Sequence, residues 1–230
     1  AVMKAVLFGF LFLLIRDFAA SAQEAAIVVV QPGSRVGDVL TDSAVYAYPL
    51  FLPGVITYRN GKSKEALLNY NAFLDEMQTI QKNDTIALNK LDVQTVIIQN
   101  DTFGRDQFFY RVERDYDKMR LASRKVFALI SRVPAAGDTS RYKLRYSVLN
   151  NGRFLKDIAP VDTLRLAVFD MFYIVNVKNV VLPVHHNTLI ELYPHKKKAL
   201  LEYLAQRSVN FYDKDAVTAL LDFVVQKNFN

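Results

Sequence analysis

The sequence predicts an α+β protein that is mainly β. We expect an antiparallel meander sheet, curved as a sandwich or an open barrel, with a C-terminal helical unit. Two observations favour this fold class. Between residues 44 and 183, short runs rich in β-branched and aromatic residues alternate with turn-forming residues. After residue 183, apolar residues recur with the period of a helix.

Residues 1–22 have the pattern of a secretory signal peptide. Lys4 supplies a positive start, an apolar run covers residues 5–15, and small residues precede Gln23. The run is shorter than the ~20 residues that a membrane span needs. We therefore expect an exported protein in the periplasm or at the cell surface of a Gram-negative bacterium, not integral in the membrane after cleavage.

Three segments follow the signal peptide. Residues 23–43 form a lead-in broken by Pro32 and by two glycines, with a short strand over the run AAIVVV. Residues 44–183 are predicted as the antiparallel β domain and residues 184–230 as the C-terminal helical unit.

Turn signals divide the β domain into hairpins. Asn60-Gly61 between two β-rich runs is a strong hairpin signal. A two-residue loop would set Arg59 opposite Lys62 and a slightly longer loop avoids that repulsion, so the register stays open. Three strands are predicted over residues 93–132, the last with one buried and one solvated side. Further turns are predicted at residues 82–84, 100–105, 115–118, 150–152 and 176–179.

The helical unit has its own start signals. Pro194 fits the first turn of a helix. Asp213 is an N-cap for a last helix. In that helix, four apolar residues at helical spacing are predicted to face inward: Val217, Leu220, Leu221 and Val224.

The stretch around Asn69, Tyr70 and Asn71 is the sequence's candidate ligand-binding site. On a strand, the two asparagines share one partly buried face. A buried carboxamide without a partner costs about 1–3 kcal/mol. The two amides therefore either bond to backbone groups where the chain leaves the sheet or line a polar pocket; we favour the backbone role and keep the pocket as the alternative.

Composition excludes several classes of function. The chain has no cysteine, which excludes disulfides, thiolate metal sites and cysteine nucleophiles. Without residues 1–22 it keeps 27 basic and 22 acidic residues, a net charge of +5. That excess favours an anionic surface component or an envelope protein as partner, and it is too small to indicate nucleic acid.

Metal and catalytic motifs are missing from the sequence. His185 and His186 are adjacent, so on a strand they would point to opposite faces, and no acidic residue has the spacing of a zinc motif. There is no nucleophile-elbow, phosphate-loop or dinucleotide motif. We predict no metal, no cofactor and no enzymatic activity. The cationic tract of Lys196, Lys197 and Lys198 is a candidate surface for an acidic partner.

Several quoted motifs resemble a known family. These are "LNYN" at residues 68–71, "DTFGRDQFFYRV" at residues 101–112, and the C-terminal stretch that begins "LIELYPHKKK" at residue 189. Together they resemble an uncharacterised family of exported proteins from Bacteroidota, over residues 50–225. The resemblance implies export and the same architecture, and it implies no activity.

Three hypotheses for function remain open at this point. The first is a non-enzymatic envelope protein that acts as a binding or structural interaction module. The second is a β scaffold that binds a lipid, glycan or peptide in a cavity of about 300 Å³ or more. The third is an unrecognised hydrolase, which would bring acids and a histidine together in a cleft.

Overall fold

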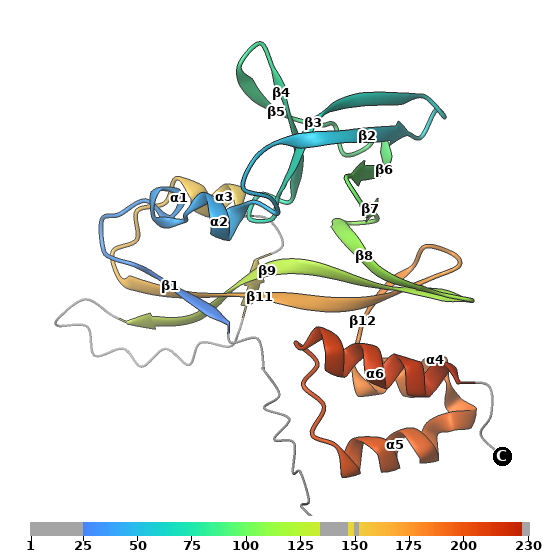
Figure 1. Ribbon diagram of the computed structural model, residues 1–230. Coiled ribbons are helices and arrows are strands. Elements are labelled where there is room, and N and C mark those ends of the chain that lie inside the picture. The colour runs from blue at the N-terminus through green and yellow to red at the C-terminus, as the bar shows by residue number, and fades with distance from the viewer. Residues whose placement is uncertain (1–24, 134–146, 150–151, 227–230) are drawn as a thin grey trace, which may run out of the picture.

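The computed structural model describes residues 25–133, 147–149 and 152–226, and it confirms a mainly β protein with C-terminal helices (Figure 1). The predicted signal peptide, residues 1–22, lies outside the described residues. The strands are β1 (Ala26–Val30), β2 (Leu52–Tyr58), β3 (Ser63–Asn71), β4 (Glu76–Gln81), β5 (Asp84–Ala87), β6 (Val93–Ile98), β7 (Asp101–Arg105), β8 (Phe109–Tyr116), β9 (Met119–Val133), β10 (Ser147–Leu149), β11 (Thr163–Asn176) and β12 (Val181–Pro183).

Within the described residues these twelve strands form one sheet, and all of its strand pairs are antiparallel. The order is β1-β11-β9-β8-β7-β6-β2-β3-β4-β5, with β10 paired to β9 and β12 to β11. The end strands β1 and β5 are not neighbours, so the sheet is not closed into a barrel. The strand β1 comes from the predicted lead-in segment and joins the sheet through β11.

The chain reverses tightly between consecutive strands of the meander. The β2–β3 loop is a three-residue loop: the amide of Gly61 bonds to the carbonyl of Tyr58 at 2.9 Å, and Gly61 has a φ of +80°. This confirms the hairpin at Asn60-Gly61 and gives the register that the sequence left open. Lys82 and Asn83 both have positive φ, which makes the β4–β5 connection a two-residue turn.

One predicted turn and one predicted strand are wrong. Residues 101–105 form the strand β7, because Gln99 takes a φ of +52° and the chain already reverses at residues 99–100. Four strands therefore cover residues 93–133 where three were predicted. The predicted hairpin at residues 142–156 lies partly outside the described residues, and its return strand is instead helix α3 (Arg153–Lys156).

Six further helical segments complete the fold. They are α1 (Val36–Val39), α2 (Asp42–Val45), α4 (His186–Leu192), the 3₁₀ turn η1 (Pro194–Lys196), α5 (Lys197–Gln206) and α6 (Lys214–Val225). Figure 1 shows α1, α2 and α3 on one side of the β9–β11 pair and α4, α5 and α6 on the other. None of the described helices is both long enough and apolar enough to cross a membrane.

The local signals of the helical unit work as predicted. Asp213 caps α6, accepting a hydrogen bond from the amide of Ala216 at 2.7 Å. Pro194 opens η1, which leads directly into α5. All four residues predicted to face inward from α6 are buried: Val217, Leu220, Leu221 and Val224.

Two hydrophobic cores share the sheet. The first core lies within its curve, among β1, the meander strands and the first helices; its largest fully buried side chains include Phe109, Phe127, Leu68 and Leu166. The second core lies under the C-terminal helices and includes Leu121, Ile174, Leu189 and Leu220. A smaller cluster covers Ala122, so the predicted solvated side of β9 is wrong there.

A polar network fastens α6 to the sheet beside the second core. The pairing of β8 with β9 shifts between Val112 and Arg114, and Glu113 is the extra residue of this bulge. The Glu113 carboxylate accepts hydrogen bonds from Ser123 Oγ at 2.5 Å and from Arg111 Nε at 2.8 Å, and it forms an ion pair with Lys214 in the first turn of α6. Further along α6, Asp222 accepts hydrogen bonds from Arg114 and Tyr116.

This network determines the ionisation of Glu113. Burial raises the pKa of the carboxyl, but hydrogen bonds from Lys214 and Ser123 and the charge of Arg111 outweigh it, so the pKa lies below its usual value. A carboxyl with a lowered pKa stabilises the fold above its unfolded pKa of about 4.3, and the contribution is lost as the pH falls through the folded pKa.

We predict that Glu113→Gln lowers the free energy of unfolding by about 1–3 kcal/mol at pH 7, because it removes the charge-assisted hydrogen bonds between a buried carboxylate and the partly exposed Arg111 and Lys214. Urea denaturation at pH 7 and at pH 3 measures the effect. The wild type should lose more stability between these pH values than the variant does. Glu191→Gln, on the exposed face of α4, is the matched control. Parallel losses in wild type and Glu113→Gln would contradict the role of this network.

Candidate functional site

Four cationic side chains gather around one pocket, which we call the cationic pocket. Its volume is about 520 Å³. Arg59 comes from the β2–β3 loop, Arg105 from the end of β7, Arg120 from the start of β9, and Lys178 from the β11–β12 turn. Figure 1 shows the β2–β3 loop and the β11–β12 turn on the same side of the molecule. The other lining residues are Gln94, Thr95, Gly104, Asp106, Tyr110 and Asn179.

The β11–β12 turn is built to hold two of these cations. Asn176 Oδ1 accepts hydrogen bonds from the amides of Lys178 and Val180, at 2.9 and 3.0 Å. Asn179 adopts a φ of +58°, which an asparagine tolerates better than most residues. Its side-chain oxygen accepts a hydrogen bond from Arg120 at 2.7 Å. The turn therefore fixes its own backbone and orients the Arg120 guanidinium.

The opposite wall is fixed by backbone contacts. The amide of Arg59 donates to the carbonyl of Asp92 at 2.8 Å, which ties the β2–β3 loop to the segment before β6. The ring of Tyr110 lies so close to Gly104 that a Cβ there would come within 2.5 Å of it. Glycine is therefore required at this position of β7.

Burial raises the pKa of the Tyr110 hydroxyl, with Asp106 adding to the shift and Arg120 opposing it. At neutral pH the hydroxyl is therefore protonated and available as a hydrogen-bond donor to a molecule in the pocket.

The four cations of the pocket are not paired with acids of the described residues. Within the described residues none of them forms an ion pair, whereas Arg111, Arg114 and Lys214 elsewhere in the fold all do. Arg105 Nε is buried and has no hydrogen-bond acceptor among the described atoms. The pocket holds four positive charges and the single carboxylate of Asp106, a net charge of +3. Such a concave cluster attracts oxyanions, which guanidinium groups bind through paired hydrogen bonds.

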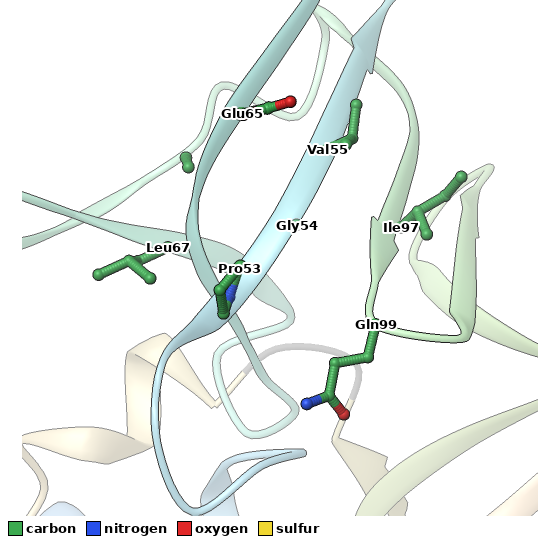
Figure 2. A pocket seen from close by; sticks show the side chains of 8 residues that line it. Pro53, Gly54, Val55, Glu65, Leu67, Ile97 and Gln99 are labelled. Atoms are coloured by element: carbon green, nitrogen blue, oxygen red, sulfur yellow. The ribbon is translucent and has the colours of Figure 1, made fainter.

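A second hollow of about 590 Å³ is an apolar groove that lies open along β2, β3 and β6. Figure 2 shows Val55 and Ile97 on adjacent strands, with Glu65 towards one end and Gln99 towards the other. Leu67 and Ile97 are 46% and 43% exposed. A surface of this kind suits contact with another molecule, but it offers few groups that would select one ligand.

The predicted ligand-binding residues lie away from the cationic pocket. Asn69 Nδ2 donates to the carbonyls of Tyr48 and Leu50, at 2.8 and 3.2 Å. Its Oδ1 accepts from the amides of Tyr48 and Tyr70, at 3.2 and 2.9 Å. These bonds fasten the segment before β2 to β3, which is the backbone role favoured from the sequence.

Asn71 and Tyr70 each have a structural partner and each lie beside a smaller hollow. Asn71 Oδ1 accepts from the amide of Leu74 at 2.9 Å and lines a hollow of about 310 Å³. The Tyr70 hydroxyl donates to Asp75 at 2.9 Å, and the residue lines a hollow of about 230 Å³ beside Arg111. Ligand binding at these two residues stays a prediction.

The lysine tract divides into two parts. Lys196 donates to the carbonyls of Val224 and Gln226, at 2.7 and 2.6 Å, so it stabilises the C-terminal end of α6. Lys197 and Lys198 are exposed at the start of α5. They remain candidates for contact with an acidic partner.

The histidines do not lie as the sequence suggested. His185 caps α4, its Nδ1 accepting from the amide of Asn187 at 3.4 Å, and its ring lies 4.0 Å from that of His186. The expectation of opposite faces is wrong because His186 begins a helix. Among the described residues, no group of three or more histidine, aspartate or glutamate side chains could hold a metal ion.

The sequence does not predict the cationic pocket. In the sequence, Arg59 stands out only through its repulsion with Lys62, and Arg105 lies in a predicted turn. Comparisons with protein-family models, with curated proteins and with solved structures give no match.

We predict that Asn69→Ala lowers the free energy of unfolding by about 3 kcal/mol, because four backbone groups lose their partner and are buried or partly buried. Chemical denaturation followed by circular dichroism measures this. Asn100→Ala, in the exposed β6–β7 turn, is the control and should change stability by less than about 0.5 kcal/mol. Equal stabilities for the two variants would contradict the fastening role of Asn69.

Proposed function

We propose that this protein is an exported, non-enzymatic binding protein of the bacterial cell envelope and that its ligand is an anion held in the cationic pocket. One observation carries the proposal: four cations line a single pocket without an ion-pair partner among the described residues. The buried Nε of Arg105 supports it, because it has no acceptor among the described atoms and an anion in the pocket would supply one.

The composition of the pocket favours binding over catalysis. Its lining includes one carboxylate and no histidine, so it lacks both the carboxylate pair and the histidine base on which hydrolytic sites most often rely. Arginine stays protonated at neutral pH and does not exchange protons with a substrate. A cluster of three arginines and a lysine therefore serves to hold an anion.

The proposed location rests on the sequence. The signal-like residues 1–22 and the resemblance to exported Bacteroidota proteins support a place in the periplasm or at the cell surface. An anionic component of the envelope is a ligand within reach there. The exposed Lys197 and Lys198 and the apolar groove offer further surfaces for an envelope partner.

We predict that inorganic pyrophosphate binds in the cationic pocket and that Arg105→Gln or Arg120→Gln weakens binding about 10- to 100-fold. Each substitution removes charge-assisted hydrogen bonds worth about 1.5–3 kcal/mol. Isothermal titration calorimetry at low ionic strength measures the dissociation constant. Affinity should fall with added salt, because salt screens the attraction.

Two control variants make this test specific. Arg165→Gln removes an exposed arginine on β11, outside the pocket, and should leave affinity unchanged. Asp106→Asn removes the one negative charge of the pocket and should strengthen pyrophosphate binding. If Arg105→Gln and Arg165→Gln weaken binding equally, the anion binds through general surface charge and the proposed site is wrong.

A further inference from the structure

The cationic pocket also indicates which class of anion it takes. Resting on the proposed function, we infer that the ligand is a saccharide that carries at least two anionic groups, whether phosphate, sulfate or carboxylate. The inference has three supports: the size of the pocket, the origin of its charges, and the polar character of the wall between them.

The size of the pocket exceeds the needs of a single ion. Its volume of about 520 Å³ falls within the range of roughly 300–1,000 Å³ that is typical of sites for organic ligands. A lone phosphate would leave most of this space unfilled. The volume therefore favours a charged organic ligand over a single inorganic ion.

The cations come from separate parts of the wall. Arg120 and Lys178 belong together, because the β11–β12 turn carries Lys178 and its Asn179 binds Arg120. Arg59 belongs to the β2–β3 loop, which is fastened to the segment before β6. Two groups of cations that belong to different segments of the fold match a ligand with at least two anionic groups.

The remaining wall is polar and uncharged, apart from one acid. Gln94, Thr95, Asn179 and the Tyr110 hydroxyl supply donors and acceptors, and none of the described residues that line the pocket is Ala, Val, Leu, Ile or Met. An acyl chain or an apolar peptide would find no matching surface here, whereas the apolar groove on β2, β3 and β6 provides one. Hydroxyl groups of a sugar match the amides and hydroxyls of this wall.

The position of Asp106 supports the same conclusion. A carboxylate repels a ligand made only of oxyanions, so its presence among four cations weakens the binding of a simple anion. It is also a strong acceptor for hydroxyl groups. A sugar hydroxyl at Asp106 gives this acid a favourable contact that a simple anion does not.

The test compares ligands that differ in one feature. Calorimetry on the full chain is run with pyrophosphate, glucose 1,6-bisphosphate, a disulfated disaccharide, digalacturonic acid and glucose. We expect at least one of the three charged saccharides to bind about tenfold or more tightly than pyrophosphate, and glucose to show no binding. The best of the three identifies phosphate, sulfate or carboxylate as the anionic group.

A variant separates recognition of the sugar from recognition of charge. Gln94→Ala should raise the dissociation constant of the best charged saccharide about fivefold or more and change that of pyrophosphate by less than about twofold. Gln99→Ala, at the apolar groove, is the control and should change neither. If pyrophosphate binds at least as tightly as every saccharide, the saccharide inference is wrong and the proposed function stands. If no anion binds, both are wrong.

Discussion

The antiparallel pairing of β9 with β11 is the interaction on which the rest of the structure depends. It runs from Thr163 opposite Val133 to Asn176 opposite Met119. Each of the two strands contributes residues to both cores. Phe127 and Val168 lie in the first core, and Leu121 and Ile174 lie in the second, an even number of positions away along the same strand. Such residues share one face of a strand. Figure 1 nevertheless shows the two groups of helices on opposite sides of the pair, because the strands twist along their length.

The same ladder determines where the cationic pocket can form. Its last pair, Met119 with Asn176, brings the start of β9 beside the β11–β12 turn. Arg120 and Lys178 are therefore neighbours although 58 positions separate them in the sequence. The curve of the sheet then brings the β2–β3 loop to the same side of the molecule (Figure 1). A shift of one residue in this pairing would turn Arg120 to the other face of β9 and separate it from Asn179.

Local signals were readable from the sequence, and non-local ones were not. The Asn60-Gly61 hairpin, the Asp213 cap and the inward face of α6 each depend on a few neighbouring residues. The alternation of the strand predicted a backbone role for Asn69, but not its partners Tyr48 and Leu50, which lie 21 and 19 positions away. The sequence does not predict the strand β7, because Asp101, Gly104 and Asp106 are residue types typical of turns. Gly104 is required there by the ring of Tyr110, which lies on the next strand, and this contact is not visible in the local sequence. The cationic pocket was missed for the same reason: its four cations come from four separate segments, and no sequence period connects them.

Charged groups are paired in one part of the fold and unpaired in another, among the residues that the structure describes. Around Glu113, Arg111 and Lys214 are paired with a buried carboxylate, and the network joins α6 to the sheet. Among the described residues that line the cationic pocket, Asp106 is the one acid that opposes the repulsion among the four cations, and no described atom accepts a hydrogen bond from Arg105 Nε. Both features cost stability in the free protein. A bound anion would remove both costs, so the ligand's affinity includes stabilisation that the fold lacks without it.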